Sequence, residues 1–177
     1  MYIRVPGLCV VEGHHPHVGE LQWPQARDGL QVYRASQRVA EVLDLVSFPR
    51  SGSHWIQQIL QLILNSGEST ESYVDFARKA PYLENRVPEG MESPRLLRMH
   101  FSMDRIKVDP KAKYVYVARN PWDCCVSCYH YVREIPVCEF QDGTFDEFLD
   151  AFLEGQSSFG DFFDHVLSGY RRRKERN

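Results

Sequence analysis

The sequence contains no long apolar run. No window approaches the roughly 18 apolar residues that a membrane-spanning helix requires, and residues 1–21 hold no apolar core long enough for a secretory signal peptide. These two absences argue against the membrane-protein and secreted-protein classes. We therefore expect a cytoplasmic protein that has no membrane partner.

An excess of positive charge is also absent. The chain has 21 Lys and Arg against 24 Asp and Glu, which gives a formal net charge of −3 and a pI near 6.2. A protein that binds polyanions over a broad surface is normally basic. We therefore expect no nucleic acid partner, and any anion site must be local. The basic run at residues 171–177 is interpreted as a solvated tail.

Cysteine is sparse. There are five cysteines, an odd number, and Cys124, Cys125 and Cys128 lie within one short stretch. This pattern does not match a secreted disulfide framework, and a single C-x-x-C pair without a second pair is a weak zinc or redox signal. We expect reduced, buried thiols and no metal site.

Internal repeats, low-complexity tracts and clear domain linkers are absent as well. A chain of 177 residues with 43% hydrophobic residues fits one domain that buries a core. We expect a single domain over residues 1–177. Its readable core covers 41–170, between an N-terminal segment, 1–40, with an uninformative pattern and the basic tail.

The sequence does contain an alternation of strand and helix patterns. A short, apolar, β-branched run at 42–48 and two further short runs at 95–101 and 113–119 predict three buried strands. A polar connection that contains prolines covers about 68–93. Because strands alternate with helices, the pattern predicts an α/β fold with a parallel sheet flanked by helices.

Helix signals follow the first and third of these strands. Apolar residues at helical spacing predict a helix that starts near Ser53 and is closed by Gly67. Asn120, followed by proline, is a typical N-cap for the next helix. Thr144 and Glu147 match a capping box before a further helix, and a last helix has its apolar face over residues 162–170.

The loop between the first strand and its helix has the chemistry of an anion site. A helix that starts at the carboxyl edge of a parallel sheet presents unpaired N–H groups and a partial positive charge. Gly52 lets the backbone approach a ligand, Ser51 and Ser53 add hydroxyl donors, and Arg50 and His54 add cationic or ring N–H donors. The alternative is a plain turn in which Ser53 caps a core helix and Arg50 is solvated. A Walker A motif is absent.

The stretch SFPRSGSHW closely resembles the TYPKSGTTW phosphosulfate-binding loop of the cytosolic sulfotransferases, whose fold is a variant of the P-loop nucleotide-binding architecture. Two later stretches resemble the same family in the same order. PRLLRMHF is similar to the family's PRLLKTHLP strand, and VYVARNPWDCCVSCYHY contains the family's Arg and Ser eight positions apart, here Arg119 and Ser127. The resemblance runs from about Val42 to Gly169 and implies a P-loop-like parallel sheet flanked by helices, incomplete at its C-terminal end.

The resemblance also implies a cofactor, 3′-phosphoadenosine 5′-phosphosulfate (PAPS). It places the 5′-phosphosulfate on residues 50–54, the adenine against Trp55, and the 3′-phosphate on Arg119 and Ser127. The last pair suits this role because a side chain at a strand end and one on the next helix can converge on one anion. From the spacing alone, the simpler interpretation is that Arg119 is a surface charge and that Ser127 is a neutral helix residue.

The implied reaction is transfer of a sulfuryl group from PAPS to a hydroxyl or amine of a small acceptor. His100 would remove the acceptor proton, while Arg50 and Arg98 would stabilise the developing charge. Phe76 and Tyr82 would bind the acceptor together with Arg98 and His100. Without the resemblance, the simpler interpretation is that His100 has a structural role. Phe76 and Tyr82 would then only cover the core.

Several positions depart from the family pattern. The loop lysine is Arg50 here, the strand lysine is Arg98, and the usual loop threonines are Ser53 and His54. The charge is retained, but an ammonium point charge becomes a planar fork that cannot give up a proton.

The end of the chain departs further. SGYRRRKERN stands where the family continues with another core strand and an RKGxxGDW segment that contacts the 3′-phosphate. We expect weaker cofactor binding and loss of the usual dimerisation segment, which leaves pairing with a full-length relative open. Two alternatives to a working sulfotransferase follow: a truncated, catalytically impaired remnant that binds the nucleotide, or a different P-loop nucleotide kinase, which the missing Walker lysine disfavours.

Overall fold

The structure is a computed structural model that describes residues 42–84, 91, 93–157 and 159–174. The segment 1–40 and residue 41 lie outside the described residues. The elements follow one another as β1 (Val42–Ser47), α2 (Ser53–Leu64), α3 (Tyr73–Arg78), β2 (Arg95–Met99), β3 (Lys113–Val117), α4 (Pro121–Glu134), a short 3₁₀ turn η1 (Pro136–Cys138), α5 (Phe145–Leu153) and α6 (Phe162–Arg172).

The described strands form one parallel sheet in the order β2-β1-β3. Leu45 at the centre of β1 is in register with Arg98 of β2 and with Val115 of β3. The carboxyl ends of all three strands therefore lie at one edge of the sheet. The predicted parallel α/β fold is confirmed, and each predicted strand is found within two residues of its expected bounds.

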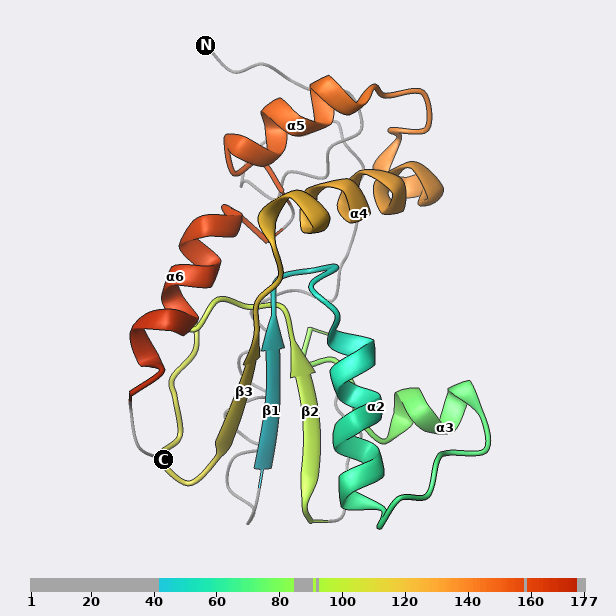
Figure 1. The fold of residues 1–177 in the computed structure, drawn as a ribbon, viewed down its shortest axis with the longest axis vertical. Coiled ribbons are helices and arrows are strands. Elements are labelled where there is room, and N and C mark those ends of the chain that lie inside the picture. The colour runs from blue at the N-terminus through green and yellow to red at the C-terminus, as the bar shows by residue number, and fades with distance from the viewer. Residues whose placement is uncertain (1–41, 85–90, 92, 158, 175–177) are drawn as a thin grey trace.

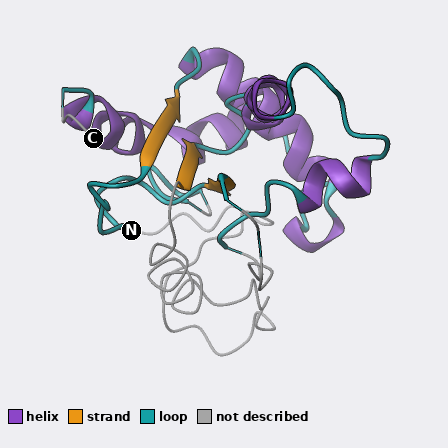
Figure 2. Ribbon diagram, turned by 90° about the horizontal axis from the view of Figure 1, so that it is seen from below, coloured by secondary structure: helices purple, strands orange, loops and turns teal. Residues whose placement is uncertain are grey.

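Helices surround this sheet on several sides. In Figure 1, α2 and α3 lie beside β2, α6 lies beside β3, and α4 and α5 lie beyond the carboxyl ends of the strands. The described helices extend to both flanks of the strands when the molecule is seen from below (Figure 2). Within the described ranges, every helix is too short or too polar to cross a membrane.

The core consists of three apolar clusters. The first lies under α2 and includes Leu45, Ala80 and Leu96, with Ile56 and Leu60 packed against it. The second covers the opposite sheet face, and its buried members include Val46, Leu97, Met99, Met103 and Ile106. The third is largely aromatic, lies under α4, α5 and α6, and includes Phe48, Phe140, Phe148, Phe152 and Phe162. Strand β1 contributes to clusters on both faces because both of its faces are buried.

Most predicted helix signals agree with the structure. The Asn120 side chain accepts from the amide of Trp122 at 2.9 Å, and Thr144 with Glu147 forms a complete capping box. Gly67, with φ of 93°, donates its N–H to the Leu62 carbonyl after α2 has ended. The prediction of a polar connection over 68–93 was wrong in one respect, because this stretch contains the helix α3. Its N-cap is Ser72, whose side chain accepts from the amide of Asp75.

Candidate active site

The turn from β1 into α2 lies at the carboxyl edge of the sheet. The Ser51 amide donates to the Phe48 carbonyl at 3.2 Å, and Gly52 has φ of 103°, a left-handed conformation that favours glycine. Gly52 is the N-cap of α2, so no side chain at this position accepts from the first-turn N–H groups. These amides and the helix dipole remain available to an anion.

The alternative in which Ser53 caps a core helix does not match this geometry. Ser53 is the first helical residue, and its Oγ lies 3.2 Å from the Tyr82 hydroxyl. The Arg50 side chain is exposed, yet it is held in place by neighbours on α4.

Arg50, Arg119 and Ser127 come together although they are far apart in the sequence. Arg119 Nη1 donates to the Arg50 carbonyl at 3.0 Å, and Arg50 Nε donates to Ser127 Oγ at 3.1 Å. The Arg50 guanidinium also lies 4.8 Å above the centre of the Tyr131 ring. Two guanidinium groups and one hydroxyl thus surround the turn, which gives the local concentration of positive charge that a multiply charged anion requires.

Two cysteines of α4 contact the backbone of the same turn. Cys124 Sγ donates to the Pro49 carbonyl at 3.2 Å and lies 3.8 Å from Ser51 Oγ, and Cys128 Sγ lies 3.7 Å from the same carbonyl. The hydrogen bond with Cys124, together with burial, raises the pKa of the Cys128 thiol, so it stays protonated at neutral pH. The predicted buried thiols are confirmed for Cys124, Cys125 and Cys128. Among the described residues, no group of His, Cys, Asp and Glu could hold a metal ion.

His100 follows β2 directly and is fixed at several atoms. Its Nδ1 lies 2.7 Å from the Ser47 carbonyl, so Nδ1 carries the proton and donates to that oxygen. Its backbone N–H donates to the Glu84 carboxylate. The ring packs against Tyr82 at 4.9 Å and Phe159 at 5.4 Å between centroids. The described residues give Nε2 no hydrogen-bond partner, and this leaves its lone pair open toward a ligand.

Burial shifts the titration of His100 and Glu84 in opposite directions. Burial lowers the pKa of His100 to about 4, with the nearby His165, Arg98 and His54 adding to this effect and the bond to Ser47 opposing it. Burial raises the pKa of Glu84 to about 7, although backbone N–H donors oppose this shift. The imidazole is therefore neutral at neutral pH and able to accept a proton.

Arg98 lies on β2, two positions before His100, and is only 3% exposed. Its Nε donates to the Ala80 carbonyl at 2.6 Å, and its guanidinium lies 3.9 Å above the Tyr82 ring. Nη1 is buried and has no hydrogen-bond partner within the described ranges. Burying a cation with an unpaired N–H donor costs free energy unless a ligand accepts that hydrogen bond. Arg98 is therefore a candidate anion ligand.

The predicted acceptor residues divide between two positions. Tyr82 contacts His100 and also lies 6.4 Å from the His54 ring. Phe76 stacks on His54 at 6.2 Å, but no contact joins Phe76 to His100 among the described residues. Burial, followed by the charges of Arg98 and Arg50, lowers the pKa of His54, which keeps its ring neutral. Trp55 is 75% exposed on the first turn of α2, so its ring face is accessible to stacking by a ligand ring as far as the described residues go.

Four residues of this site were not predicted from the sequence: Ser47, Glu84, Tyr131 and Phe159. Each reaches the site through a contact between distant parts of the chain. A local signal existed only for Ser47, because it is the last residue of an apolar strand that leads into the turn. Sequence spacing does not indicate the other three.

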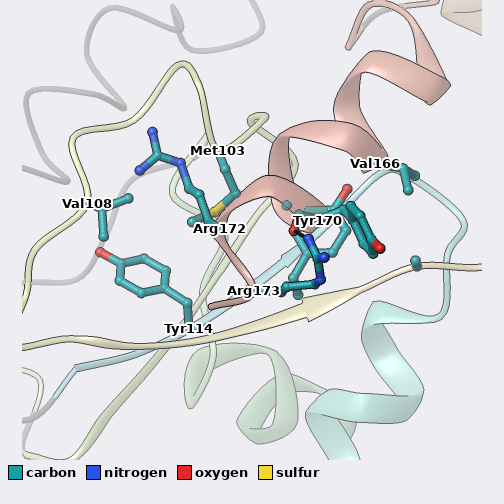
Figure 3. Close-up of a pocket in the computed structure, with 10 residues that line it drawn as sticks. Met103, Val108, Tyr114, Val166, Tyr170, Arg172 and Arg173 are labelled. Atoms are coloured by element: carbon teal, nitrogen blue, oxygen red, sulfur yellow. Dashed lines mark hydrogen bonds between the residues drawn. The ribbon is translucent and has the colours of Figure 1, made fainter. Parts of the chain in front are cut away.

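A cavity of about 400 Å³ lies away from these residues, between β3 and α6 (Figure 3). Its walls are mostly apolar and aromatic, and they also include Arg172 at the end of α6 and Arg173 directly after it. Its lining includes Met103, Val108, Tyr114, Tyr116, Val166 and Tyr170. Because it contains none of the predicted site residues, we assign the chemistry to the turn and not to this cavity.

Comparison with known proteins places this chain in a family. The family model described as "Sulfotransferase domain" matches residues 42–177. Sulfotransferase 1 family member D1 from Rattus norvegicus is 34% identical over 168 residues, which covers 88% of this chain and 56% of the relative. Sulfotransferase 1A1 from Canis lupus familiaris is 33% identical, covering 80% of this chain and 51% of the relative. The chain thus spans about half the length of the curated relatives it matches.

Solved structures show the same fold. Mouse sulfotransferase SULT7A1 complexed with PAP superimposes with a TM-score of 0.63 at 24% identity, over 85% of this chain and 54% of that one. Retinol dehydratase in a complex with retinol and PAP gives a TM-score of 0.69 at 16% identity, over 86% of this chain and 57% of that one. At these identities the likeness concerns the fold.

Proposed function

Because this chain belongs to the sulfotransferase domain family, we propose that it transfers a sulfuryl group from PAPS to a hydroxyl or amine of a small acceptor. One observation carries the proposal. The uncapped start of α2, with Arg50, Arg119 and Ser127 around it, lies at the same sheet edge as a histidine whose Nε2 is open.

The donor set fits a nucleotide with two phosphate groups. The amides after Gly52, the hydroxyls of Ser51 and Ser53, and Arg50 would hold the phosphosulfate end. Arg119 and Ser127 would hold the 3′-phosphate, because both already contact Arg50 and lie on the α4 side of the turn. The matched structures of SULT7A1 and retinol dehydratase are complexes with PAP, which supports this class of cofactor. PAPS supplies the activated sulfuryl group.

His100 would act as the general base. Its Nδ1–H is engaged by Ser47, so the neutral ring presents the Nε2 lone pair to the acceptor hydroxyl. Nε2 would take the proton that the acceptor hydroxyl loses as its oxygen replaces the phosphate oxygen on the sulfuryl group that PAPS supplies. The pKa of about 4 makes His100 a weak base in the free protein, so much of the catalysis must come from positioning and charge.

The cations Arg50 and Arg98 would balance charge on the leaving phosphate. Arg50 already borders the turn, and the open Nη1 of Arg98 is a donor that a ligand oxygen would complete. An arginine fork suits two oxygens of one group, whereas it offers no proton to the leaving oxygen. We therefore assign charge stabilisation, not proton donation, to both residues.

The acceptor would be a small molecule with an aromatic or otherwise apolar body. Tyr82 and Phe159 lie against the His100 ring, and Phe76 lies farther away beyond His54. Tyr82 therefore borders the reacting atoms, while Phe76 would contact the distal part of a longer acceptor.

Two measurements on the 177-residue chain test this proposal. Calorimetric titration with adenosine 3′,5′-bisphosphate should show saturable binding that is stronger than for adenosine 5′-monophosphate and that Arg119→Ala weakens. Transfer from radiolabelled PAPS to a panel of phenols and alcohols should occur and should be lost in His100→Ala. Binding without transfer would indicate a nucleotide-binding remnant, and preference for a nucleoside triphosphate with magnesium would indicate a kinase. A folded chain that binds neither would refute the assignment of the turn.

A further inference from the structure

A second histidine, His165 of α6, lies behind His100 and has no part in the chemistry described so far. Its side chain is fully buried, with 1% exposure, and it contacts residues at the ends of all three described strands. Its Nε2 lies 2.9 Å from the His100 carbonyl and its Nδ1 lies 2.6 Å from the Tyr116 hydroxyl. Its ring packs edge-on against Phe48 at 5.5 Å.

These contacts define which ring nitrogen of His165 carries the proton. Burial lowers the pKa of His165, so the ring is neutral and has one N–H. The Tyr116 hydroxyl is a donor, because burial raises its pKa, and it is shared between Nδ1 and the His165 carbonyl, 2.9 Å away. Nδ1 is then the acceptor and Nε2–H donates to the His100 carbonyl, whose oxygen can only accept.

The packing of α6 against β3 makes this arrangement specific. Gly169 lies one helical turn after His165, and a Cβ at Gly169 would meet the Tyr116 ring at 2.4 Å. Only glycine therefore lets α6 approach β3 closely enough for the hydroxyl of Tyr116 to reach Nδ1. Ser168 adds a second link, because its hydroxyl accepts from the Met103 amide at 3.0 Å and donates to the His165 carbonyl at 2.6 Å.

The same contacts complete the support of His100. Its amide is bound by Glu84 and its Nδ1–H by Ser47, so His165 occupies its remaining backbone group. Loss of the His165 donor would leave the His100 carbonyl without a partner among the described residues. The peptide after the strand could then rotate, and the ring would leave its bond to Ser47.

We propose that His165 is a positioning residue, which holds the His100 backbone through Nε2–H and thereby keeps the His100 ring in the tautomer with an open Nε2. This inference rests on the proposed function, because that function gives His100 its role as the base. The geometric part, a link between His165 and the tautomer of His100, holds whether or not the chain turns over PAPS.

The experiment compares three variants of the full chain. His165→Leu removes the donor and keeps an apolar side chain of moderate volume. His165→Gln keeps an N–H donor near the position of Nε2. Ser168→Ala is the matched control, because it removes the buried hydrogen bonds to the Met103 amide and the His165 carbonyl and keeps the Nε2–H donor of His165.

The first readout is the imidazole ¹⁵N spectrum of His100, which reports the tautomer without any need for activity. The wild type, His165→Gln and Ser168→Ala should show Nδ1–H, whereas His165→Leu should show a mixture of tautomers. In the transfer assay, kcat of His165→Leu should fall about ten- to hundredfold with little change in nucleotide affinity, because a misplaced base loses rate and not binding.

Three results would overturn the inference: an unchanged His100 tautomer in folded His165→Leu, an equal change in Ser168→Ala, or no recovery in His165→Gln. If His165→Leu does not fold, His165→Asn decides, since its shorter side chain cannot bring an N–H donor to the His100 carbonyl, and an unchanged His100 spectrum in that variant would contradict the proposal. An inactive wild type that still shows these tautomers would refute the proposed function and leave the positioning role standing.

Discussion

Helix α2 and helix α5 begin in opposite ways. Thr144 and Glu147 close the start of α5 with a reciprocal capping box, and Asn120 and Asp161 cap α4 and α6 with side-chain oxygens. At the start of α2 there is only Gly52, which has no side chain. The side-chain caps accept hydrogen bonds from the first amides of their helices. The first amides of α2 have no such side-chain acceptor, and a ligand can bind them.

This difference separates helices that serve stability from a helix that serves binding. A side-chain cap contributes about 1 kcal/mol to helix stability. The start of α2 lacks that contribution at the one place where guanidinium groups of Arg50 and Arg119 also gather. Positive charge without a local counterion is the physical signature of an anion site.

The largest effect is expected from giving α2 an acidic cap. Gly52→Asp places a carboxylate on the free amides and next to the two arginines, and it repels a bound phosphate. We expect nucleotide affinity to fall about 100-fold, since each 1.4 kcal/mol of lost binding is tenfold. Calorimetry with adenosine 3′,5′-bisphosphate measures this change.

The control for that variant is Gly52→Asn. It has nearly the same shape and suffers the same strain at φ of 103°, but it carries no charge. Gly52→Asn should bind at least about tenfold more tightly than Gly52→Asp, because only the carboxylate opposes the anion. Equal affinities for the two variants would mean that backbone strain, and not charge, explains the loss.

The second-largest effect is expected at Arg50, which lies beside the uncapped start of α2. Arg50→Ala should weaken nucleotide binding about tenfold, in line with the loss of one charge-assisted hydrogen bond. Arg50→Lys should lose less, because it keeps the charge but cannot hold Ser127 as the guanidinium does. If Arg50→Lys and Arg50→Ala bind equally, the fork geometry and not the charge is what matters.

The capped start of α5 should show the reverse pattern, a loss of stability without a loss of nucleotide binding. Thr144→Ala removes the cap of α5 and should lower the free energy of unfolding by about 1 kcal/mol. Nucleotide affinity should stay unchanged, because α5 contacts the turn through the Phe152 ring against Phe48, whereas the Thr144 side chain bonds, among the described residues, only within its own cap. Urea denaturation and calorimetry on the same sample give both values, and a parallel loss of binding would show that the two helix ends are not independent.

The smallest effect is the pH dependence of the same cap. Hydrogen bonds from the Thr144 amide and hydroxyl lower the pKa of Glu147 from its ordinary value of 4.5. The contribution of the carboxylate is therefore fully present above pH 4.5 and is lost as the pH falls through the lowered pKa. Unfolding curves of the wild type and Glu147→Gln should differ at pH 7, and the difference should shrink as the pH falls below 4.5. A difference that stays the same throughout the acid range would contradict a role for the ionised group.

Local patterns predicted the elements that depend on neighbours in the sequence. The three strands were found because each lies in a short run that is rich in large apolar residues, and α5 because its capping box lies within four residues. Helix α3 was missed although Ser72 and Asp75 have the spacing of a cap, because six residues give too little apolar periodicity to stand out.

The candidate site could be predicted only in part. The turn at residues 50–54 and the spacing from Arg119 to Ser127 are visible in the sequence, and the structure brings them together. Glu84 and His165 could not be found this way, because they meet His100 across 16 and 65 residues. Such contacts follow from how the strands and α6 pack, and no local spacing encodes that packing.

The turn between β1 and α2 has three carbonyl oxygens in a row that already have partners. Those of Phe48, Pro49 and Arg50 accept from the Ser51 amide, the Cys124 thiol and the Arg119 guanidinium. The backbone therefore loses its conformational entropy when the protein folds and not when a ligand arrives. Association should then follow a single step whose rate depends on diffusion and ionic strength, with no slow phase of loop ordering.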